Sequence, residues 1–145
     1  MSRAAVAVSW VVTLVGGLII LGGLGALTND SAVGVTPYRT AWVAWSLEVA
    51  GLLVCLACLL VAKPFAQWRA VIVGMLAIPT AVLIPIADLV LTAKGALPGS
   101  NGSDSRANTT AAGLIICMCG NYLLALAVCL FDDTPAVVAE SKVGV

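Results

Sequence analysis

The stretch that decides the fold lies at the beginning of the chain, in residues 4–27, which read AAVAVSWVVTLVGGLIILGGLGAL. None of these 24 residues is charged. About 20 helical residues, each rising about 1.5 Å, cross the roughly 30 Å hydrocarbon core of a bilayer. The run is also longer than the apolar core of a signal peptide, which has about 7–15 residues. We therefore predict one transmembrane helix here, acting as an uncleaved signal anchor.

Three more apolar runs of similar length follow along the chain. The predicted spans are residues 4–27, 40–62, 70–93 and 110–131. Membrane barrel strands would instead show alternating patterns over about 10 residues, so helices are expected. The sequence predicts an all-α integral membrane protein: one membrane domain over residues 1–145, folded as a four-transmembrane-helix bundle, with a short cytosolic tail at 132–145.

The composition agrees with a chain whose solvent is lipid. Hydrophobic residues make up 61% of the 145-residue chain and charged residues only 10%, whereas a soluble domain has about 25% charged residues. The formal net charge is zero, which gives no argument for an electrostatic partner. These values exclude a nucleic-acid binder, a secreted disulfide scaffold and a disordered tail.

The direction of insertion follows from basic residues and from glycosylation sequons. With the N-terminus inside, four basic residues lie in the cytosol and three outside, in the sense of the positive-inside rule. Candidate N-glycosylation sites are Asn29, Asn101 and Asn108, all in the first and third predicted loops. These loops share a side in a four-span protein. We expect a glycoprotein with both termini in the cytosol, in the plasma membrane or another secretory-pathway membrane of a eukaryote.

Each span carries a stripe of small and polar residues at helical spacing, which lets helix backbones approach closely. The stripes are Ser9, Thr13, Gly16, Ile20 and Gly23 in the first span; Ala41, Ala44, Glu48, Gly51 and Cys55 in the second; Gly74, Ala77, Ala81, Pro85, Asp88 and Thr92 in the third; and Thr110, Gly113, Cys117, Asn121 and Ala125 in the fourth. The simplest arrangement places all four stripes inward. In the alternative, a glycine-rich stripe on the first span faces a partner chain. The glycines expected at helix-packing or partner interfaces are Gly16, Gly17, Gly22, Gly23, Gly25, Gly51, Gly74 and Gly113.

Intramembrane polar residues are the strongest candidates for a functional site. A carboxylate in a span costs roughly 2.5–3.5 kcal/mol on insertion scales, so Glu48 and Asp88 are expected to be paired, neutralised or functional. Counted from the outer span ends at 1.5 Å per residue, Glu48 lies about 12 Å deep and Asp88 about 8 Å deep, so the two acids could meet. Asn121 is expected to accept a hydrogen bond from a protonated Glu48. The two acids are either fasteners between helices, which we favour, or a proton or cation site.

Two prolines and five cysteines complete the unusual features of the spans. Pro79 and Pro85 predict kinks in the third helix; the alternative is a hinge or a broken helix at a binding site. All five cysteines lie within spans, and Cys129 near the cytosolic end is a candidate for palmitoylation. The CxxC spacing of Cys55 and Cys58 has no second pair and no His beside it, so no metal site and no cofactor are expected.

The topology and one acid resemble a known family. A short four-span chain with cytosolic ends, short loops and Asp88 in the sequence Ile86-Ala87-Asp88-Leu89 resembles the plant and algal Casparian-strand membrane-domain proteins and their MARVEL relatives. The resemblance implies a scaffold that oligomerises or escorts other membrane proteins. The first span lacks the basic residue that the family pairs with this acid, the third loop has no cysteines, and Glu48 has no assignable counterpart.

No nucleophile–base pair, phosphate loop or soluble domain is visible in the sequence, so we do not expect an enzyme. The leading hypothesis is a structural or accessory subunit, or scaffold, that packs against a larger polytopic membrane protein (a transporter, pump or channel) or against copies of itself. Membrane lipids are expected partners and nucleic acid is not. The alternative is a small proton- or cation-coupled transporter or channel that uses Glu48 and Asp88.

Overall fold

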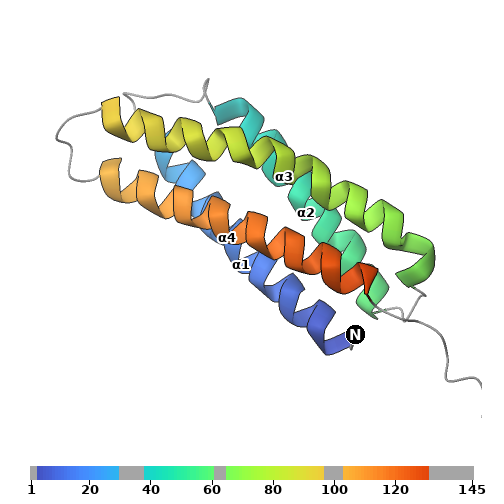
Figure 1. The fold of residues 1–145 in the computed structure, drawn as a ribbon. Coiled ribbons are helices and arrows are strands. Elements are labelled where there is room, and N and C mark those ends of the chain that lie inside the picture. Colours follow the sequence, from blue (N-terminus) through green and yellow to red (C-terminus); the bar gives the residue numbers. More distant parts are fainter. Residues whose placement is uncertain (1–2, 30–37, 61–64, 97–102, 131–145) are drawn as a thin grey trace, which may run out of the picture.

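The computed structural model describes residues 3–29, 38–60, 65–96 and 103–130, and within these ranges the chain is helical and contains no strand. The four helices are α1 (Arg3–Thr28), α2 (Arg39–Leu60), α3 (Phe65–Ala96) and α4 (Ser103–Cys129). Successive helices run in opposite directions (Figure 1). They pack in a ring in which α1 contacts α2, α2 contacts α3, α3 contacts α4, and α4 returns to α1.

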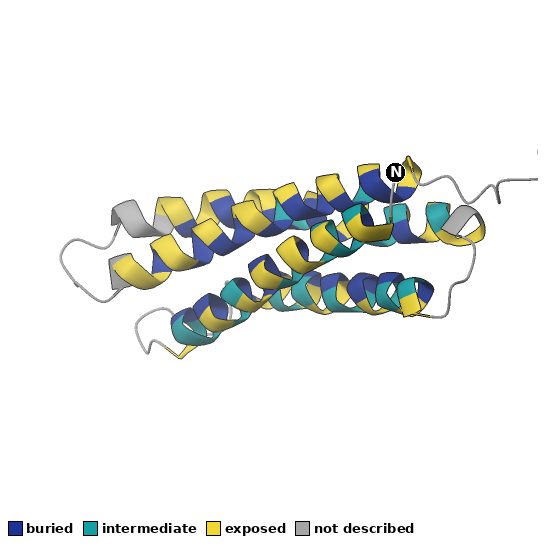
Figure 2. Cartoon of the chain, turned by 90° about the horizontal axis from the view of Figure 1, so that it is seen from below, coloured by how far each residue is buried: buried dark blue, intermediate teal, exposed yellow. Residues whose placement is uncertain are grey.

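All four helices are long and apolar enough to cross a membrane. Their 22 to 32 residues correspond to about 33 to 48 Å. Buried residues line the inward side of each helix and exposed residues the outward side (Figure 2). Large exposed apolar side chains occur on every helix, for example Val8, Leu53, Ile84 and Leu126. Such a surface suits lipid rather than water.

Two helices extend further than the apolar runs predict. Helix α3 begins at Phe65 and ends at Ala96, and α4 begins at Ser103 rather than at residue 110. The predicted loop before residue 110 is therefore shorter than expected. An apolar run marks only the part of a helix that suits lipid, and a helix can continue into polar residues. The Ser and Asp residues at 103–105 are polar but favour a helix start. The predicted tail, residues 132–145, lies outside the described residues.

Glycines allow α1 and α4 to make the closest helix contact in the bundle. A Cβ atom at Gly16 would lie 2.6 Å from the backbone nitrogen of Cys117, and one at Gly113 would lie 2.9 Å from the backbone nitrogen of Ile20. Gly23 similarly contacts Thr110 of α4. Two helix backbones can reach this separation only where no side chain stands between them.

The other glycines of the sequence prediction have different surroundings. Gly51 makes an ordinary contact with Met75 of α3, at 3.5 Å from the position of a Cβ atom. Gly17 is buried, yet a Cβ atom there would meet nothing within 4 Å. The same open space surrounds three glycines that do not pack against another helix of this chain: Gly22, Gly25 and Gly74. The closely packed part of the glycine-rich stripe on α1 is thus occupied by α4.

The small-residue stripe of α3 faces outward, so the prediction that all four stripes face inward is wrong for this helix. The exposed residues are Gly74, Ala77, Ala81, Pro85, Asp88 and Thr92. The inward side of α3 carries large side chains instead, including Ile72, Leu76, Leu83 and Val90. These side chains fill the close-packed interior together with large side chains of the other helices, such as Leu24, Leu52 and Leu114.

Two apolar clusters form the core, one in each half of the bundle. The first contains Leu24, Leu83 and Leu114 together with Tyr38. The second contains Leu52, Ile72, Leu76 and Leu124, from α2, α3 and α4, with Val6 of α1. The buried polar side chains that belong to neither cluster are Thr13, Glu48, Thr80, Thr110 and Asn121.

Candidate functional site: a polar layer at the centre of the bundle

One buried polar side chain from each helix contributes to a layer between the two apolar clusters. We define the polar layer as Thr13 of α1, Glu48 of α2, Thr80 of α3 and Asn121 of α4. Glu48 and Thr80 lie near the midpoints of their helices. Thr13 lies at the same level because it packs against Gly120, the residue before Asn121. A glycine at this position leaves room for the Thr13 backbone. The four helices are long and apolar enough to cross a membrane, and in a chain inserted in this way the layer would lie near the bilayer midplane.

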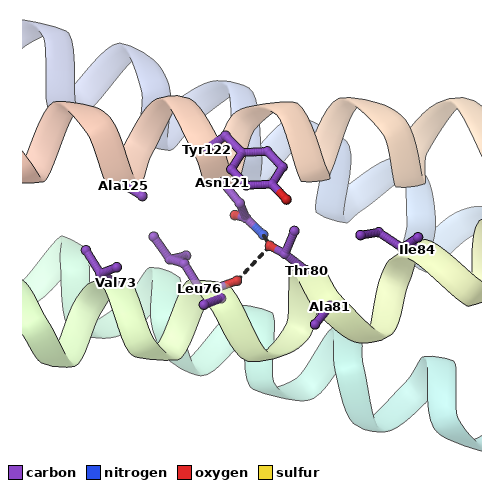
Figure 3. A pocket seen from close by; sticks show the side chains of 9 residues that line it. Val73, Leu76, Thr80, Ala81, Ile84, Asn121, Tyr122 and Ala125 are labelled. Atoms are coloured by element: carbon purple, nitrogen blue, oxygen red, sulfur yellow. Dashed lines mark hydrogen bonds between the residues drawn. The ribbon is translucent and has the colours of Figure 1, made fainter.

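Asn121 is the centre of the hydrogen bonds in this layer. Its Nδ2 donates to Glu48 Oε2 at 2.7 Å and to Thr80 Oγ1 at 2.9 Å. The Thr80 hydroxyl in turn donates to the backbone oxygen of Leu76 at 2.7 Å (Figure 3). The Cys117 thiol lies beside the Glu48 carboxyl group. One amide therefore connects α2, α3 and α4.

Two acceptor oxygens in the layer are buried without a hydrogen-bond partner among the described residues: Glu48 Oε1 and Asn121 Oδ1. Glu48 is only 1% exposed and Asn121 only 2%. No Lys, Arg or His occurs in residues 4–27, 40–62, 70–93 or 110–131. Buried polar groups in native proteins nearly always have partners, so these two oxygens call for a hydrogen-bond donor that the described side chains do not supply.

The predicted contact between Glu48 and Asn121 is present, with Asn121 as the donor. The predicted meeting of Glu48 with Asp88 does not occur, because Asp88 is exposed and lies eight residues, about 12 Å, along α3 from Thr80. Depths counted from the ends of apolar runs placed the two acids at one level. That estimate assumed that the outer ends of the two apolar runs lie at one level, whereas the hydrogen bonds of Asn121 place Thr80, not Asp88, level with Glu48.

Two tryptophans join α1 to α2, and sequence analysis had not assigned them this role. Trp45 Nε1 donates to the backbone oxygen of Gly17 at 3.0 Å, and Trp10 Nε1 donates to that of Leu52 at 2.9 Å. An indole near a span end is typical of an interfacial anchor, so Trp10 did not stand out. A tryptophan at a mid-span position facing a glycine, as Trp45 does, is the feature that could have indicated the contact.

Trp45→Phe is expected to weaken the bundle by about 0.6 kcal/mol, the average for side-chain hydrogen bonds between membrane helices, and by no more than about 1.7 kcal/mol, their maximum. Phe keeps an aromatic ring but cannot donate to the Gly17 carbonyl. Unfolding in mixed detergent and denaturing micelles would measure the change. Trp68→Phe is the matched control, because Trp68 is exposed near the start of α3. Equal effects of the two substitutions would contradict a specific role for Trp45.

A lateral pocket of about 270 Å³ opens between α3 and α4 beside the polar layer (Figure 3). It is lined by Val73, Leu76, Ala77, Thr80, Ala81, Ile84, Asn121, Tyr122 and Ala125. Most of this lining is apolar. Thr80 and Asn121 are the two residues of the polar layer that line the pocket. Helix α3 continues unbroken through Pro79 and Pro85, so the pocket does not lie at a broken helix.

The remaining candidate residues lie apart from the polar layer. Asn29 is exposed directly after α1, Asn108 is exposed within α4 rather than in a loop, and Asn101 lies outside the described residues. Cys129 is exposed at the end of α4. In the part of the chain that the structure describes, no three His, Cys, Asp or Glu side chains gather where they could hold a metal ion.

Comparison with known proteins adds no relative to this description. No family model, curated protein or solved structure matches the chain.

Proposed function

We propose that this protein is a non-catalytic tetraspan scaffold that associates with copies of itself in the membrane. The observation that carries the proposal is the outward face of α3, defined as Gly74, Ala77, Ala81, Pro85, Asp88 and Thr92. It combines small side chains at helical spacing with an exposed carboxylate. Small residues suit close helix contact, and nothing in the described part of the chain covers them.

Asp88 makes lipid an unsuitable neighbour for this face. It lies about 12 Å from the level of Thr80, and the hydrocarbon core extends about 15 Å from the midplane. A carboxylate inside this boundary is expensive unless it is paired or reaches water. No described residue of the same chain forms an ion pair with Asp88. A cation from outside the chain would neutralise it.

A second copy of the chain offers a cation at the required level. Arg39 is exposed at the start of α2, nine residues and about 13 Å outward from Glu48. The hydrogen bonds of the polar layer place Glu48 level with Thr80, so Arg39 and Asp88 lie at similar depths. In a two-fold dimer each contact occurs twice, so Arg39 of each copy would face Asp88 of the other.

Scaffolding by self-association also accommodates the broader expectations from sequence. An assembly of four-span chains with cytosolic termini in the plasma membrane could hold a larger transporter, pump or channel on its remaining apolar faces. The alternative of proton- or cation-coupled transport through Glu48 and Asp88 has less support, because the two acids are apart and apolar clusters flank the polar layer on both sides.

Charge exchange between Arg39 and Asp88 tests the proposal. We expect Asp88→Arg and Arg39→Asp each to weaken dimerisation at least tenfold, because each places like charges at the interface. The double variant should restore association. The measurement is energy transfer between donor- and acceptor-labelled chains in liposomes over a range of protein-to-lipid ratios.

A matched control comes from the outer face of α1. Gly22→Leu changes an exposed glycine with open space around it and should leave dimerisation unchanged, whereas Ala81→Leu on α3 should weaken it. A wild-type chain that stays monomeric at every protein-to-lipid ratio would refute self-association. So would a double charge variant that associates no better than the single variants.

A further inference from the structure

We propose that Glu48 and Asn121 together form a proton-binding site at the centre of the bundle. The bound proton lies on the Glu48 carboxyl group and is shared with the Asn121 amide oxygen. The site is independent of the outward face of α3 and of any self-association there. Its basis is the shortage of hydrogen-bond donors in the polar layer.

Counting donors and acceptors shows this shortage. The two amide hydrogens of Asn121 are used by Glu48 Oε2 and Thr80 Oγ1, and the Thr80 hydroxyl hydrogen is used by the Leu76 carbonyl. Glu48 Oε1 and Asn121 Oδ1 are then left as acceptors without a donor. One proton on Glu48 Oε1 turns that oxygen into a donor. A carboxylic acid and an amide can then pair through two hydrogen bonds, N–H to Oε2 and O–H to Oδ1, which satisfies both orphaned atoms.

The shortage does not depend on which way the Asn121 amide is turned. The oxygen and nitrogen of an amide are assigned from the hydrogen-bond network. The opposite orientation would place Oδ1 against Glu48 Oε2, where two acceptors would again face each other. A proton on Glu48 is needed in that arrangement as well.

The groups around Glu48 offer its negative charge hydrogen bonds from Asn121 and from the Cys117 thiol, a weak donor, but the described residues that face it include no positive charge. Helix α1 contributes Thr13 to the layer and α3 contributes Thr80, and neither side chain is charged. Helix α4 contributes the Cys117 thiol beside the carboxyl group, and Cys55 is the nearest other titratable residue along α2. A buried ion without a partner costs several kcal/mol. A bound proton removes that charge and supplies the missing donor at the same time.

The proton is taken up from water when the bundle forms and returns to water when Glu48 ionises. Above the pH at which the unfolded chain loses this proton, folding requires proton uptake. The folding equilibrium should then fall by up to tenfold per pH unit as the pH rises. Raising the pH above about 4, where an unfolded glutamate ionises, is expected to loosen the contact of α2 with α4 progressively.

Infrared spectroscopy of the full chain in liposomes tests the site directly. At neutral pH the wild-type chain should show the carbonyl stretch of a protonated carboxylic acid. The band should persist in Asp88→Asn and disappear in Glu48→Gln. Absence of the band from the wild-type chain at neutral pH would overturn the proposal, as would a band that survives Glu48→Gln.

Stability against pH provides a second readout on a variant expected to fold. Glu48→Gln imitates the neutral acid, because its amide has one acceptor and a donor in place of the hydroxyl. This variant should match wild type below about pH 4, where Glu48 is neutral in the unfolded chain as well. At neutral pH it should be the more stable of the two, and its stability should not fall as the pH rises. If the stability of wild type does not fall as the pH rises, the site binds no proton and the proposal is refuted. If sodium ions stabilise wild type but not Glu48→Gln at neutral pH, the site binds a metal cation instead, which also refutes the proposal.

Discussion

Gly16→Leu is expected to prevent α1 from packing on α4 and to remove the folded bundle. A Cβ atom at this position would lie 2.6 Å from the nitrogen and 2.8 Å from the Cα atom of Cys117. Backbone atoms cannot rotate away as a flexible side chain can, so one helix must move. Inserting a single extra group into a packed core costs about 1–3 kcal/mol, and leucine adds four carbon atoms. We expect a loss above about 3 kcal/mol.

Unfolding in mixed micelles measures this effect, with Gly22→Leu as the control on the same helix. Gly22 is exposed and a Cβ atom there meets nothing within 4 Å, so the change should stay within about 0.5 kcal/mol. The comparison separates crowding from the general response of a helix to leucine. A stable Gly16→Leu bundle would mean that α1 and α4 do not pack as described.

Asn121→Leu is expected to have the second largest effect, a loss of about 2 kcal/mol. The substitution keeps a side chain of similar size but removes both hydrogen bonds donated by the amide, to Glu48 Oε2 and to Thr80 Oγ1. Leaving a buried polar partner unsatisfied costs about 1–3 kcal/mol. Tyr122→Leu is the control at the next position, because Tyr122 is 60% exposed, and its effect should be small.

The double variant Glu48→Leu, Asn121→Leu sharpens this prediction. Replacing both partners by apolar groups can be nearly neutral, whereas removing one leaves the other unsatisfied. The double variant should therefore be more stable than Asn121→Leu alone, with an interaction energy of about 1 kcal/mol or more between the two positions. Strict additivity of the two single effects would show that the side chains do not interact.

Several features of the candidate site were accessible from sequence because they depend on residue type and spacing alone. Glu48 and Asn121 are polar residues on the small-residue stripes of their spans, and both are buried. Residue spacing also indicated the closely packed Gly16 and Gly23 of α1 and Gly113 of α4. It did not indicate Gly120, which lies beside Asn121 and admits the Thr13 backbone, because a glycine outside a regular stripe shows its purpose only when its neighbour is known.

Apolar length by itself determined that this chain forms four membrane-length helices, because a hydrocarbon core requires about 20 apolar residues per helix. Only the tertiary structure decided which side of each helix is buried. The small stripes of α1, α2 and α4 turn inward and that of α3 turns outward, because α3 packs its large side chains, with those of the other helices, into the close-packed interior. The same rotation places Asp88 on the surface, while Glu48 contacts Asn121 inside the bundle. The distance between the two acids depends on how the helices are aligned with one another, which residue spacing within a single helix does not give.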